Sequence, residues 1–333
     1  MPRCIRILKK DGEELRSRLV NSGLLDIRHK IRVDGEYLEI PVLCNSFEGY
    51  ETEELEAEEL EVRSMDYKVF LDFPDWLNEE LPRSYDLIGD VALIKIADVL
   101  IPYKEKIGDA MIEATPCIRV VMLDSGVKGE FRVRKLERIS GTGTSETVHK
   151  EFGVRIAVDP SLVYFNPRLA SERARIALAV KKGETVIDMF AGVAPFPIVI
   201  SKLAHAKVIY AIDLNPEVER FTNLSIEMNH IKNIVPITGD AREVVKQLPK
   251  ADRIIMNLPQ SSDEFLDSAM ESAKTGAVIH MHKVLERADL EDFLLGIEKR
   301  MSSLGYKMHI ARTWELKSYS LSMSVYVFDI VKD

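Results

Sequence analysis

Long apolar runs and paired cysteines are scarce in this chain of 333 residues. No run approaches the roughly 20 apolar residues that cross a bilayer, and the opening MPRCIRILKKDGEE has no apolar segment of signal-peptide length. The three cysteines, Cys4, Cys44 and Cys117, lie far apart without a C-x-x-C pair or a nearby histidine cluster. These absences disfavour a membrane protein, a disulfide framework and a zinc site, so we expect a cytoplasmic protein that needs no metal.

Several nucleotide-binding and catalytic loop patterns are also missing. Neither G-x-x-x-x-G-K-[ST] nor G-x-S-x-G occurs, which disfavours a P-loop NTPase and an α/β-hydrolase. The strand-like run VIDMF leads into Gly192, but Val193, Ala194 and Pro195 follow where G-x-G-x-x-G would place more glycines. The missing glycines therefore make a NAD(P)-linked oxidoreductase the weaker alternative and favour a protein that binds a ligand without phosphates. S-adenosylmethionine is such a ligand.

Charge is distributed unevenly along the chain. The net charge of −9 argues against a protein that coats nucleic acid non-specifically. Acidic residues crowd residues 47–61, whereas basic residues prevail in VKGEFRVRKLER, residues 127–138. Such a local basic track can still contact a phosphate backbone, although most charge runs are only solvated faces.

The pattern of apolar residues changes twice and predicts three domains, at 1–64, 65–166 and 167–333. The first contains a strand, a helix and a hairpin that turns at Asp34-Gly35, followed by the acidic segment as a helix or linker. The second contains a hairpin around Gly89-Asp90 and a helix. The third alternates strands and helices and ends in two β-rich runs, which predicts an α/β doubly wound, mostly parallel sheet of the class I methyltransferase Rossmann-like type with an antiparallel C-terminal hairpin.

Two aspartates follow predicted strands of the third domain. Asp213 lies about 20 residues beyond the glycine loop, where a carboxylate that binds ribose belongs, or it caps the helix that follows Pro216. Asp240 can accept a hydrogen bond from an adenine amino group, or it is likewise a helix cap. The joint occurrence of the glycine loop and Asp213 favours the cofactor role for that residue.

Other polar and aromatic residues have competing interpretations. The run MNLPQ ends a predicted central strand, where Asn257 and Pro259 can hold a planar amide-like edge, or Pro259 simply ends the strand. Tyr164 can stack on a base or belong to the core. Glu172 opens a helix, where an acid also complements the helix dipole. His280 and His282 lie on a predicted buried strand without further metal ligands.

Taken in order, GEFRVRKLERISG, ETVHKEFG, VYFNPRLASERARI, VIDMFAGVAPF, YAIDLNP, GDAREV and IIMNLPQ resemble the archaeal and eukaryotic tRNA (guanine(37)-N1)-methyltransferase family. The resemblance covers essentially the whole chain and includes the opening CIRILKKDGEELR, which is similar to that of the archaeal three-domain subtype. It implies transfer of a methyl group from S-adenosylmethionine to N1 of the guanine that lies 3′ of the anticodon. The small first domain resembles a reader of the tRNA elbow, the middle domain is expected to bind RNA, and no protein partner is expected, so a monomer is predicted.

The resemblance also implies roles for individual residues. Glu172 matches the general base that removes the N1 proton, with a pKa raised by burial beside the base, and Arg132 matches the residue that stabilises guanine O6. Asn257 and Pro259 complete the implied catalytic set. The implied cofactor-binding residues are Tyr164, Asp188, Phe190, Gly192, Asp213, Leu214, Asp240, Ala241 and Asn257. The implied substrate-binding residues are Arg132, Arg134, Tyr164, Arg168 and Asn257.

The chain departs from the family pattern at two positions. Ala194 stands where GVGPF has a second glycine, which is expected to add a methyl group near the ligand. Gln260 follows NLP, where a tyrosine would favour relatives that act on a later wyosine precursor or transfer an aminocarboxypropyl group. That wyosine-pathway activity on the same nucleotide remains the alternative function, and a non-catalytic RNA-binding module is a further one.

Overall fold

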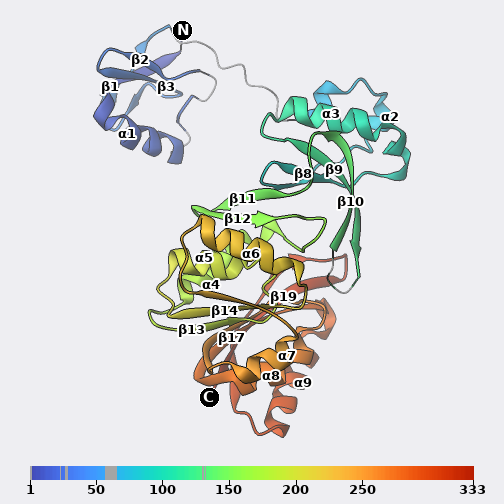
Figure 1. Cartoon of the computed structure of the whole chain (residues 1–333). Helices are drawn as coiled ribbons and strands as arrows, with labels where there is room; N and C mark the ends of the chain where they lie inside the picture. The colour runs from blue at the N-terminus through green and yellow to red at the C-terminus, as the bar shows by residue number, and fades with distance from the viewer. Residues whose placement is uncertain (1, 23, 27–28, 57–65, 130, 132) are drawn as a thin grey trace. The chain divides into compact units, whose positions relative to one another are not determined.

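The chain folds into two compact units, residues 1–66 and residues 67–333 (Figure 1). The computed structural model describes residues 2–22, 24–26, 29–56, 66–129, 131 and 133–333. Each unit has an apolar core of its own. Among the described residues, no helix combines the length and the apolar character needed to span a bilayer.

The first unit is a small antiparallel sheet packed against one helix. Its strand order is β2-β3-β1-β6, and Leu15 and Leu19 of the helix are buried against Ile5 and Ile40 of the sheet. Gly35 takes a φ of 56° at the predicted hairpin turn, a conformation that favours glycine. The elements are β1 (Arg3–Leu8), α1 (Lys9–Asn21), β2 (Arg32–Asp34), β3 (Tyr37–Val42), β4 (Ser46–Phe47), β5 (Tyr50–Glu51) and β6 (Glu53–Glu54).

The acidic segment differs from the expectation of a helix or linker. Residues 46–54 form the short strands β4, β5 and β6, and β6 pairs with β1 through Arg3 with Glu54 and Cys4 with Glu53. The glutamates of β6 are exposed at the edge of the sheet, where charged side chains remain hydrated. Backbone pairing at an edge therefore outweighs the low β-propensity of glutamate. Residues 57–61 of the predicted segment lie outside the described residues.

The second unit begins with a four-stranded sheet of order β10-β9-β8-β7, covered by α3. The predicted hairpin at Gly89 is confirmed, and a Cβ atom there would lie 2.2 Å from Thr147 Oγ1, so only glycine fits. The predicted helix is split, because a 3₁₀ segment containing Pro102 precedes α3. The elements are η1 (Tyr67–Phe70), α2 (Asp75–Asn78), β7 (Asp86–Ile88), β8 (Val91–Ile94), η2 (Asp98–Tyr103), α3 (Lys104–Ala114), β9 (Val120–Lys128), β10 (Val133–Gly141), β11 (Thr147–Glu151) and β12 (Val154–Val158).

A seven-stranded sheet forms the rest of the second unit, and its order is β15-β14-β13-β16-β17-β19-β18. The first five strands are parallel, and the last two pair antiparallel, so the predicted fold class is confirmed. Its helices are η3 (Pro167–Leu169), α4 (Ala170–Ala179), α5 (Pro195–Leu203), α6 (Glu217–Met228), α7 (Ala241–Val244), η4 (Val245–Gln247), η5 (Ser262–Phe265), α8 (Leu266–Ser272), η6 (Arg287–Asp289) and α9 (Leu290–Ser303). Its strands are β13 (Thr185–Asp188), β14 (Val208–Asp213), β15 (Ile234–Thr238), β16 (Ala251–Met256), β17 (Ala273–Glu286), β18 (Met308–Ser318) and β19 (Met323–Lys332).

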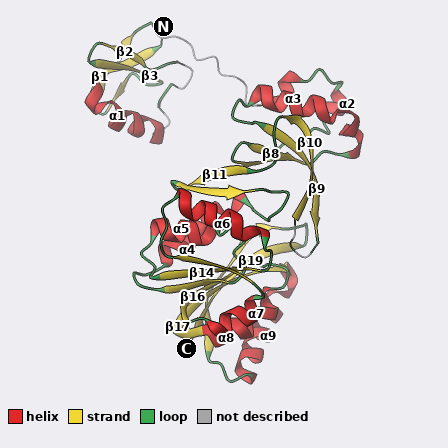
Figure 2. Ribbon diagram, viewed as in Figure 1, coloured by secondary structure: helices red, strands yellow, loops and turns green. Residues whose placement is uncertain are grey.

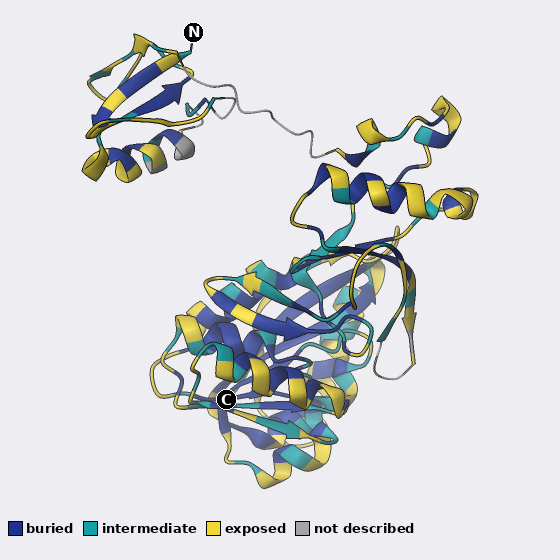
Figure 3. Cartoon of the chain, turned by 45° about the horizontal axis from the view of Figure 1, so that its top comes forward, coloured by how far each residue is buried: buried dark blue, intermediate teal, exposed yellow. Residues whose placement is uncertain are grey.

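Helices cover both faces of this sheet (Figure 2). Helices α4, α5 and α6 bury one apolar cluster against it, and α7, α8 and α9 bury another on the opposite face. The strands between these layers are largely buried (Figure 3). Since β13 to β16 run parallel, the residues that follow them emerge along one edge of the sheet, where ligands bind in open α/β folds.

Candidate active site

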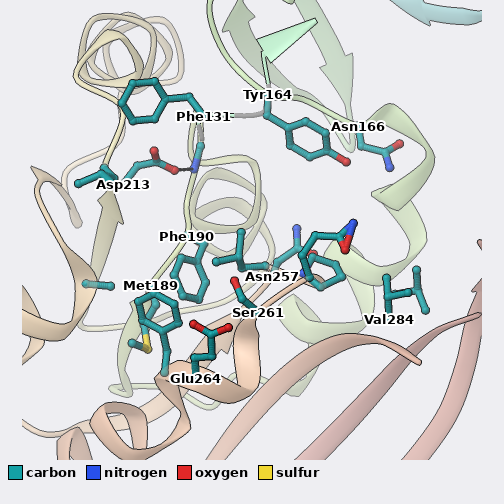
Figure 4. Close-up of a pocket in the computed structure, with 18 of the residues that line it drawn as sticks. Phe131, Tyr164, Asn166, Met189, Phe190, Asp213, Asn257, Ser261, Glu264 and Val284 are labelled. Atoms are coloured by element: carbon teal, nitrogen blue, oxygen red, sulfur yellow. Dashed lines mark hydrogen bonds between the residues drawn. The ribbon is translucent and has the colours of Figure 1, made fainter. Parts of the chain in front are cut away.

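A cavity of about 530 Å³ lies at the carboxyl ends of these parallel strands (Figure 4). Its size is that of a site for a small molecule. Nine residues predicted for the site line it together: Tyr164, Phe190, Gly192, Asp213, Leu214, Asp240, Ala241, Asn257 and Pro259. Glu172, Asp188, Arg134 and Arg168 do not line this cavity. Arg132 lies outside the described residues.

The loop after β13 brings backbone groups to the cavity. Gly192 has a φ of 53°, and its N–H donates to Asp213 Oδ2 over 2.7 Å. A Cβ atom on Gly192 would lie 3.3 Å from the carbonyl oxygen of Tyr164, so the loop and Tyr164 are close neighbours. Ala194 also has a positive φ, 57°, but its side chain is fully buried in the core and does not line the cavity. The expectation of an added methyl group near the ligand is therefore wrong.

Asp213 is bound by backbone groups on both oxygens. Besides Gly192, the N–H of Asn215 donates to its Oδ1 over 2.9 Å, and Asn215 rather than Asp213 accepts the N–H of Glu217 at the start of α6. Burial raises the pKa of Asp213, although the hydrogen bonds from Asn215 and Gly192 oppose that shift. Its carboxylate is thus held rigidly at the cavity wall by the glycine loop.

Asp240 serves as a helix cap and also lines the cavity. Its Oδ1 accepts the N–H of Arg242 over 2.9 Å at the start of α7, and its Oδ2 lies 2.7 Å from the Arg242 guanidinium. The hydrogen bond from the Arg242 side chain lowers the pKa of Asp240. The carboxylate is therefore ionised and remains partly exposed to the cavity.

The NLPQ loop is fixed to the neighbouring strand. The N–H of Val284 in β17 donates to the Pro259 carbonyl over 2.7 Å, and Ser262 Oγ donates to the Leu258 carbonyl over 2.6 Å. Asn257 directly follows β16, and its side chain is one of those drawn around the cavity in Figure 4. The amide group of Asn257 is thus presented from a loop whose backbone is anchored on two sides.

Aromatic and apolar side chains form another wall. Phe190 and Phe265 meet edge to face with ring centroids 4.9 Å apart, and Met189 and Leu214 also contribute to the lining. Phe131, from the loop between β9 and β10, reaches the same cavity. Flat apolar surfaces beside carboxylates suit a ligand that joins a heteroaromatic ring to a sugar.

The final hairpin supplies residues that sequence reasoning missed. Leu316, Lys317, Tyr319 and Val325 of the β18–β19 region line the cavity, and Gln260 Nε2 donates to the Tyr319 hydroxyl over 3.2 Å. The hairpin itself is predictable from its two β-rich runs. That it borders the cavity depends on β19 lying between β17 and β18, for which the sequence carries no signal that we recognise.

Glu172 lies behind the cavity and is nearly fully buried, with 3% of its surface exposed. Its two oxygens accept hydrogen bonds from Arg175 Nε and Nη2, both at 2.8 Å. Burial opposes ionisation, but Arg175, with His282 beside it, holds the pKa of Glu172 below its ordinary value. In the ligand-free chain these side-chain partners outweigh burial, and the rise in the pKa of Glu172 expected beside a bound base stays a prediction.

The predicted arginines and Asp188 are held by local partners. Arg134 Nη1 pairs with Asp124 at 2.5 Å, and Asp86 binds both Arg134 Nη2, at 3.3 Å, and Arg168 Nε, at 2.7 Å. Asp188 is completely buried; its Oδ1 accepts the N–H of Phe190, and its Oδ2 has no hydrogen-bond partner among the described residues. Burial, reinforced by the nearby Asp213, raises the pKa of Asp188 to about 8.

The cavity fits S-adenosylmethionine on the chemistry of its walls. It combines a carboxylate at the end of β14, a second one after β15 and an aromatic pair in the same lining, which match a ribose, an adenine amino group and an adenine ring. Within the described part of the chain, no group of three or more His, Cys, Asp and Glu side chains is placed to hold a metal ion.

Comparison with known proteins gives matches along nearly the whole chain. The TRM5/TYW2 methyltransferase domain family matches residues 147–307, the TYW2 N-terminal domain matches residues 71–144, and the tRNA methyltransferase 5 N-terminal domain matches residues 4–51. The tRNA (guanine(37)-N(1))-methyltransferase Trm5b of Pyrococcus abyssi is 37% identical, with 96% of each chain covered.

Two further relatives bear on the choice between activities. The tRNA(Phe) (4-demethylwyosine(37)-C(7)) aminocarboxypropyltransferase of Methanocaldococcus jannaschii is 32% identical, but covers only 68% of this chain and 92% of its own. A solved complex of aTrm5 with tRNALeu is 32% identical and superposes with a TM-score of 0.71, covering 100% of both chains. With its glycine loop, its NLPQ segment and its first unit all matched, the chain belongs to the archaeal and eukaryotic tRNA (guanine(37)-N1)-methyltransferase family.

Proposed function

We propose that this chain methylates N1 of guanosine 37 in tRNA with S-adenosylmethionine as the methyl donor. The observation that carries the proposal is that one cavity unites Asp213 and the glycine loop with Asn257 and Pro259. The first pair suits the donor, and the second suits a planar base placed against it. The full-length likeness to the Pyrococcus abyssi enzyme supports the choice of nucleotide.

Most of the residues proposed to hold the donor lie at the ends of four strands, β13, β14, β15 and β16. We assign Asp213 to the ribose hydroxyls, Asp240 and Ala241 to the adenine edge, and Leu214 with Phe190 to the adenine ring. Gly192, Tyr164 and Asn257 complete the set, while Asp188 supports the loop from below through the N–H of Phe190. When bound, S-adenosylmethionine supplies an electrophilic methyl group, whose bond to sulfur breaks as the bond to N1 forms.

The guanine side of the reaction requires loss of a proton from N1. We assign Glu172 as the acceptor of that proton and Arg132 as the group that stabilises charge on O6. Asn257, Pro259 and Tyr164 position the base, and Arg134 and Arg168 contact the RNA nearby. Arg175 occupies one acceptor site on each oxygen of Glu172 in the ligand-free chain, and a carboxylate oxygen has a second lone pair with which it can accept the N1 proton.

We further propose a division of labour among three regions. Residues 1–64 contact the tRNA elbow, residues 65–166 bind the anticodon stem-loop, and residues 167–333 bind the donor and carry out the transfer. The match of residues 4–51 to the tRNA methyltransferase 5 N-terminal domain supports the first assignment. The tRNA substrate is compatible with the cytoplasmic location that we propose, and we also propose a monomer.

The direct test measures transfer of labelled methyl groups to unmodified tRNA transcripts. Transcripts with guanine at position 37 should be labelled, and transcripts with adenine there should not; equal labelling would remove the site assignment. Mass spectrometry of the product separates the alternative activity, because an aminocarboxypropyl group is much heavier than a methyl group.

The assigned roles are tested by single-turnover rates. Glu172→Gln should lower the rate by about 10² or more while donor binding is kept, since general base catalysis contributes about 10²–10⁴-fold. Arg132→Ala should also lower it. The matched control is Glu298→Gln on the exposed face of α9, which should keep the full rate. A full rate in the Glu172→Gln variant would exclude that residue as the base.

A further inference from the structure

A second titratable side chain lies behind the cavity and is not used by the proposed mechanism. His282 of β17 has no exposed surface, and within the described residues neither of its ring nitrogens makes a hydrogen bond. Buried polar groups are normally paired, because an unpaired one loses its hydration without compensation. The exception at His282 therefore calls for an explanation.

The nearest ionisable partner of His282 is the proposed base. Its Nε2 lies 3.3 Å from Glu172 Oε1, a separation that a small rotation of either side chain turns into a hydrogen bond. By contrast His280, two residues earlier on the same face of β17, is saturated: Nδ1 lies 2.5 Å from Asp329, and Nε2 lies 2.7 Å from Arg253. His282 is thus the histidine of this pair whose ring nitrogens are not engaged in hydrogen bonds within the described residues.

The charges around His282 come from several elements. From α4, Glu172 faces it directly, and Arg175 binds Glu172 while also pairing with Asp329 of β19 at 3.0 Å. His280 on β17 and Arg253 on β16 lie further along the same ion-pair network. From α5, the Phe196 ring lies 6.2 Å from the imidazole, so that side is apolar. The carboxylate of Glu172 is the charge in direct reach.

His282 also lies close to the wall of the cavity. Side chains two residues apart on a strand point to the same face, and Val284, the next residue on the face of His282, lines the cavity. In the parallel register Met256 of β16 pairs with Met281 of β17. The next residues of the two strands, Asn257 and His282, are therefore neighbours at the strand end. The pair formed by Glu172 and His282 is therefore adjacent to the place where the base is held.

We propose that His282 is the second proton carrier of the methyl-transfer reaction and takes over the proton that Glu172 removes from guanine N1. This inference rests on the proposed function, because it assumes Glu172 as the first acceptor. The N1–H bond breaks and an O–H bond forms on Glu172; that O–H bond then breaks as an N–H bond forms on His282 Nε2. The result is an imidazolium beside a restored carboxylate, and the proton leaves to water after the product departs.

The surroundings of Glu172 explain why a second carrier is useful. A carboxylate that accepts two hydrogen bonds from a guanidinium is a weak base, and protonation takes from Arg175 one of its two anionic partners. Passing the proton to His282 restores the ion pair with Arg175. It also keeps the proton from returning to N1 before the methyl group arrives.

The test compares His282→Gln with His280→Gln in the full chain. Glutamine can place an amide near the position of Nε2, but it does not take up a proton at neutral pH. His282→Gln should lower the single-turnover rate by about 10-fold or more, with donor and tRNA affinities unchanged. The pH profile of the rate gives a second readout, which a merely structural role would not move. It should differ from wild type in His282→Gln and match wild type in His280→Gln.

A measurement without turnover covers the case in which His282→Gln fails to fold. In the free protein with isotope-labelled histidine, the imidazole signals of His282 should shift in Glu172→Gln, because the carboxylate 3.3 Å from Nε2 is gone, whereas those of His280 should stay unchanged. A His282 signal that does not respond to Glu172→Gln would overturn the proposal. So would a wild-type rate and pH profile in folded His282→Gln, whereas a full rate in Glu172→Gln would instead overturn the proposed base.

Discussion

Two groups of largely buried carboxyl groups differ in what neutralises them, one on the parallel strands and one formed by Glu172 of α4 and Asp329 of β19. Asp188 and Asp213, at the ends of β13 and β14, are held by backbone N–H groups, and burial raises the pKa of both. Glu172 and Asp329 are comparably buried, but Arg175 pairs with each of them. Burial opposes the ionisation of these two as well, yet the guanidinium and the neighbouring histidines hold their pKa values low.

The comparison shows that burial does not by itself decide the charge of a carboxyl group. Side-chain partners, Arg175 first at Glu172 and His280 first at Asp329, reverse the effect of desolvation, whereas backbone donors only reduce it. At the ends of β13 and β14, burial thus favours the protonated form of the carboxyl groups. The side behind the cavity keeps ionised groups that lock α4 to β19 through Arg175.

The largest effect on stability is expected from removing the shared cation. Arg175→Met leaves the buried Glu172 and Asp329 without their shared cation and with only His282 and His280 beside them, which should lower the free energy of unfolding by about 4 kcal/mol. Denaturant unfolding at pH 7 measures this loss. Arg312→Met, at an exposed position of β18, is the control and should change stability by less than about 0.5 kcal/mol. Equal losses in both variants would contradict the importance of the shared pair.

The next effect concerns Asp329 alone. Because its pKa is lowered, its contribution to stability is present above its ordinary pKa and is lost as the pH falls through the lowered value. Asp329→Asn should therefore destabilise the chain by about 3 kcal/mol at pH 7, and the difference from wild type should shrink in acid. Unfolding measured from pH 7 downward checks this, and a difference independent of pH would speak against the charge as its cause.

Asp188 should behave in the opposite way. Since its pKa is raised to about 8, the folded chain favours the protonated form, and stability is lost as the pH rises from the ordinary value of 3.8 through about 8. An asparagine does not ionise, so Asp188→Asn removes this pH-dependent loss of stability. After the cost of burying an amide is subtracted, the variant should be more stable than wild type by about 2 kcal/mol at pH 8. A variant that is less stable than wild type at pH 8 would refute the comparison with Asp329.

The smallest effect is expected at an exposed carboxylate. Asp240→Ala should weaken S-adenosylmethionine binding by about fivefold to tenfold, or about 1 kcal/mol, because Arg242 and water already satisfy part of this group. Isothermal titration calorimetry measures the affinity. Asp289→Ala, an exposed aspartate before α9, provides the control, and the same weakening there would exclude a specific contact at Asp240.

Much of the sheet and of the cavity edge could be predicted from the sequence. Strands of a parallel sheet are continuous apolar runs, and polar residues at their ends, such as Asp213 and Asn257, necessarily share one edge. The acidic segment was predicted wrongly because composition does not reveal that β6 pairs with β1 at an edge. The local sequence pattern thus predicts most helices and strands, whereas a strand such as β6 forms only because a distant strand is available to pair with it.

Long-range contacts account for what the sequence could not provide. The pairing of Glu172 with Arg175 spans three positions and is visible as a spacing, but Asp329 and His282 reach the same group only through the order of β17 and β19. The lowered pKa of Glu172 depends on that arrangement. Tyr319 was missed for the same reason.

The cavity wall described above draws on residues from Phe131 to Val325. A fragment that starts at residue 167 retains the glycine loop and Asp213, yet it lacks Phe131, Tyr164 and Asn166 from the wall. A fragment cut at such an apparent domain limit would therefore keep the recognisable glycine-loop sequence but lose part of the wall of the binding cavity. A shortened, split or transplanted version of this enzyme therefore has to include that whole span of residues.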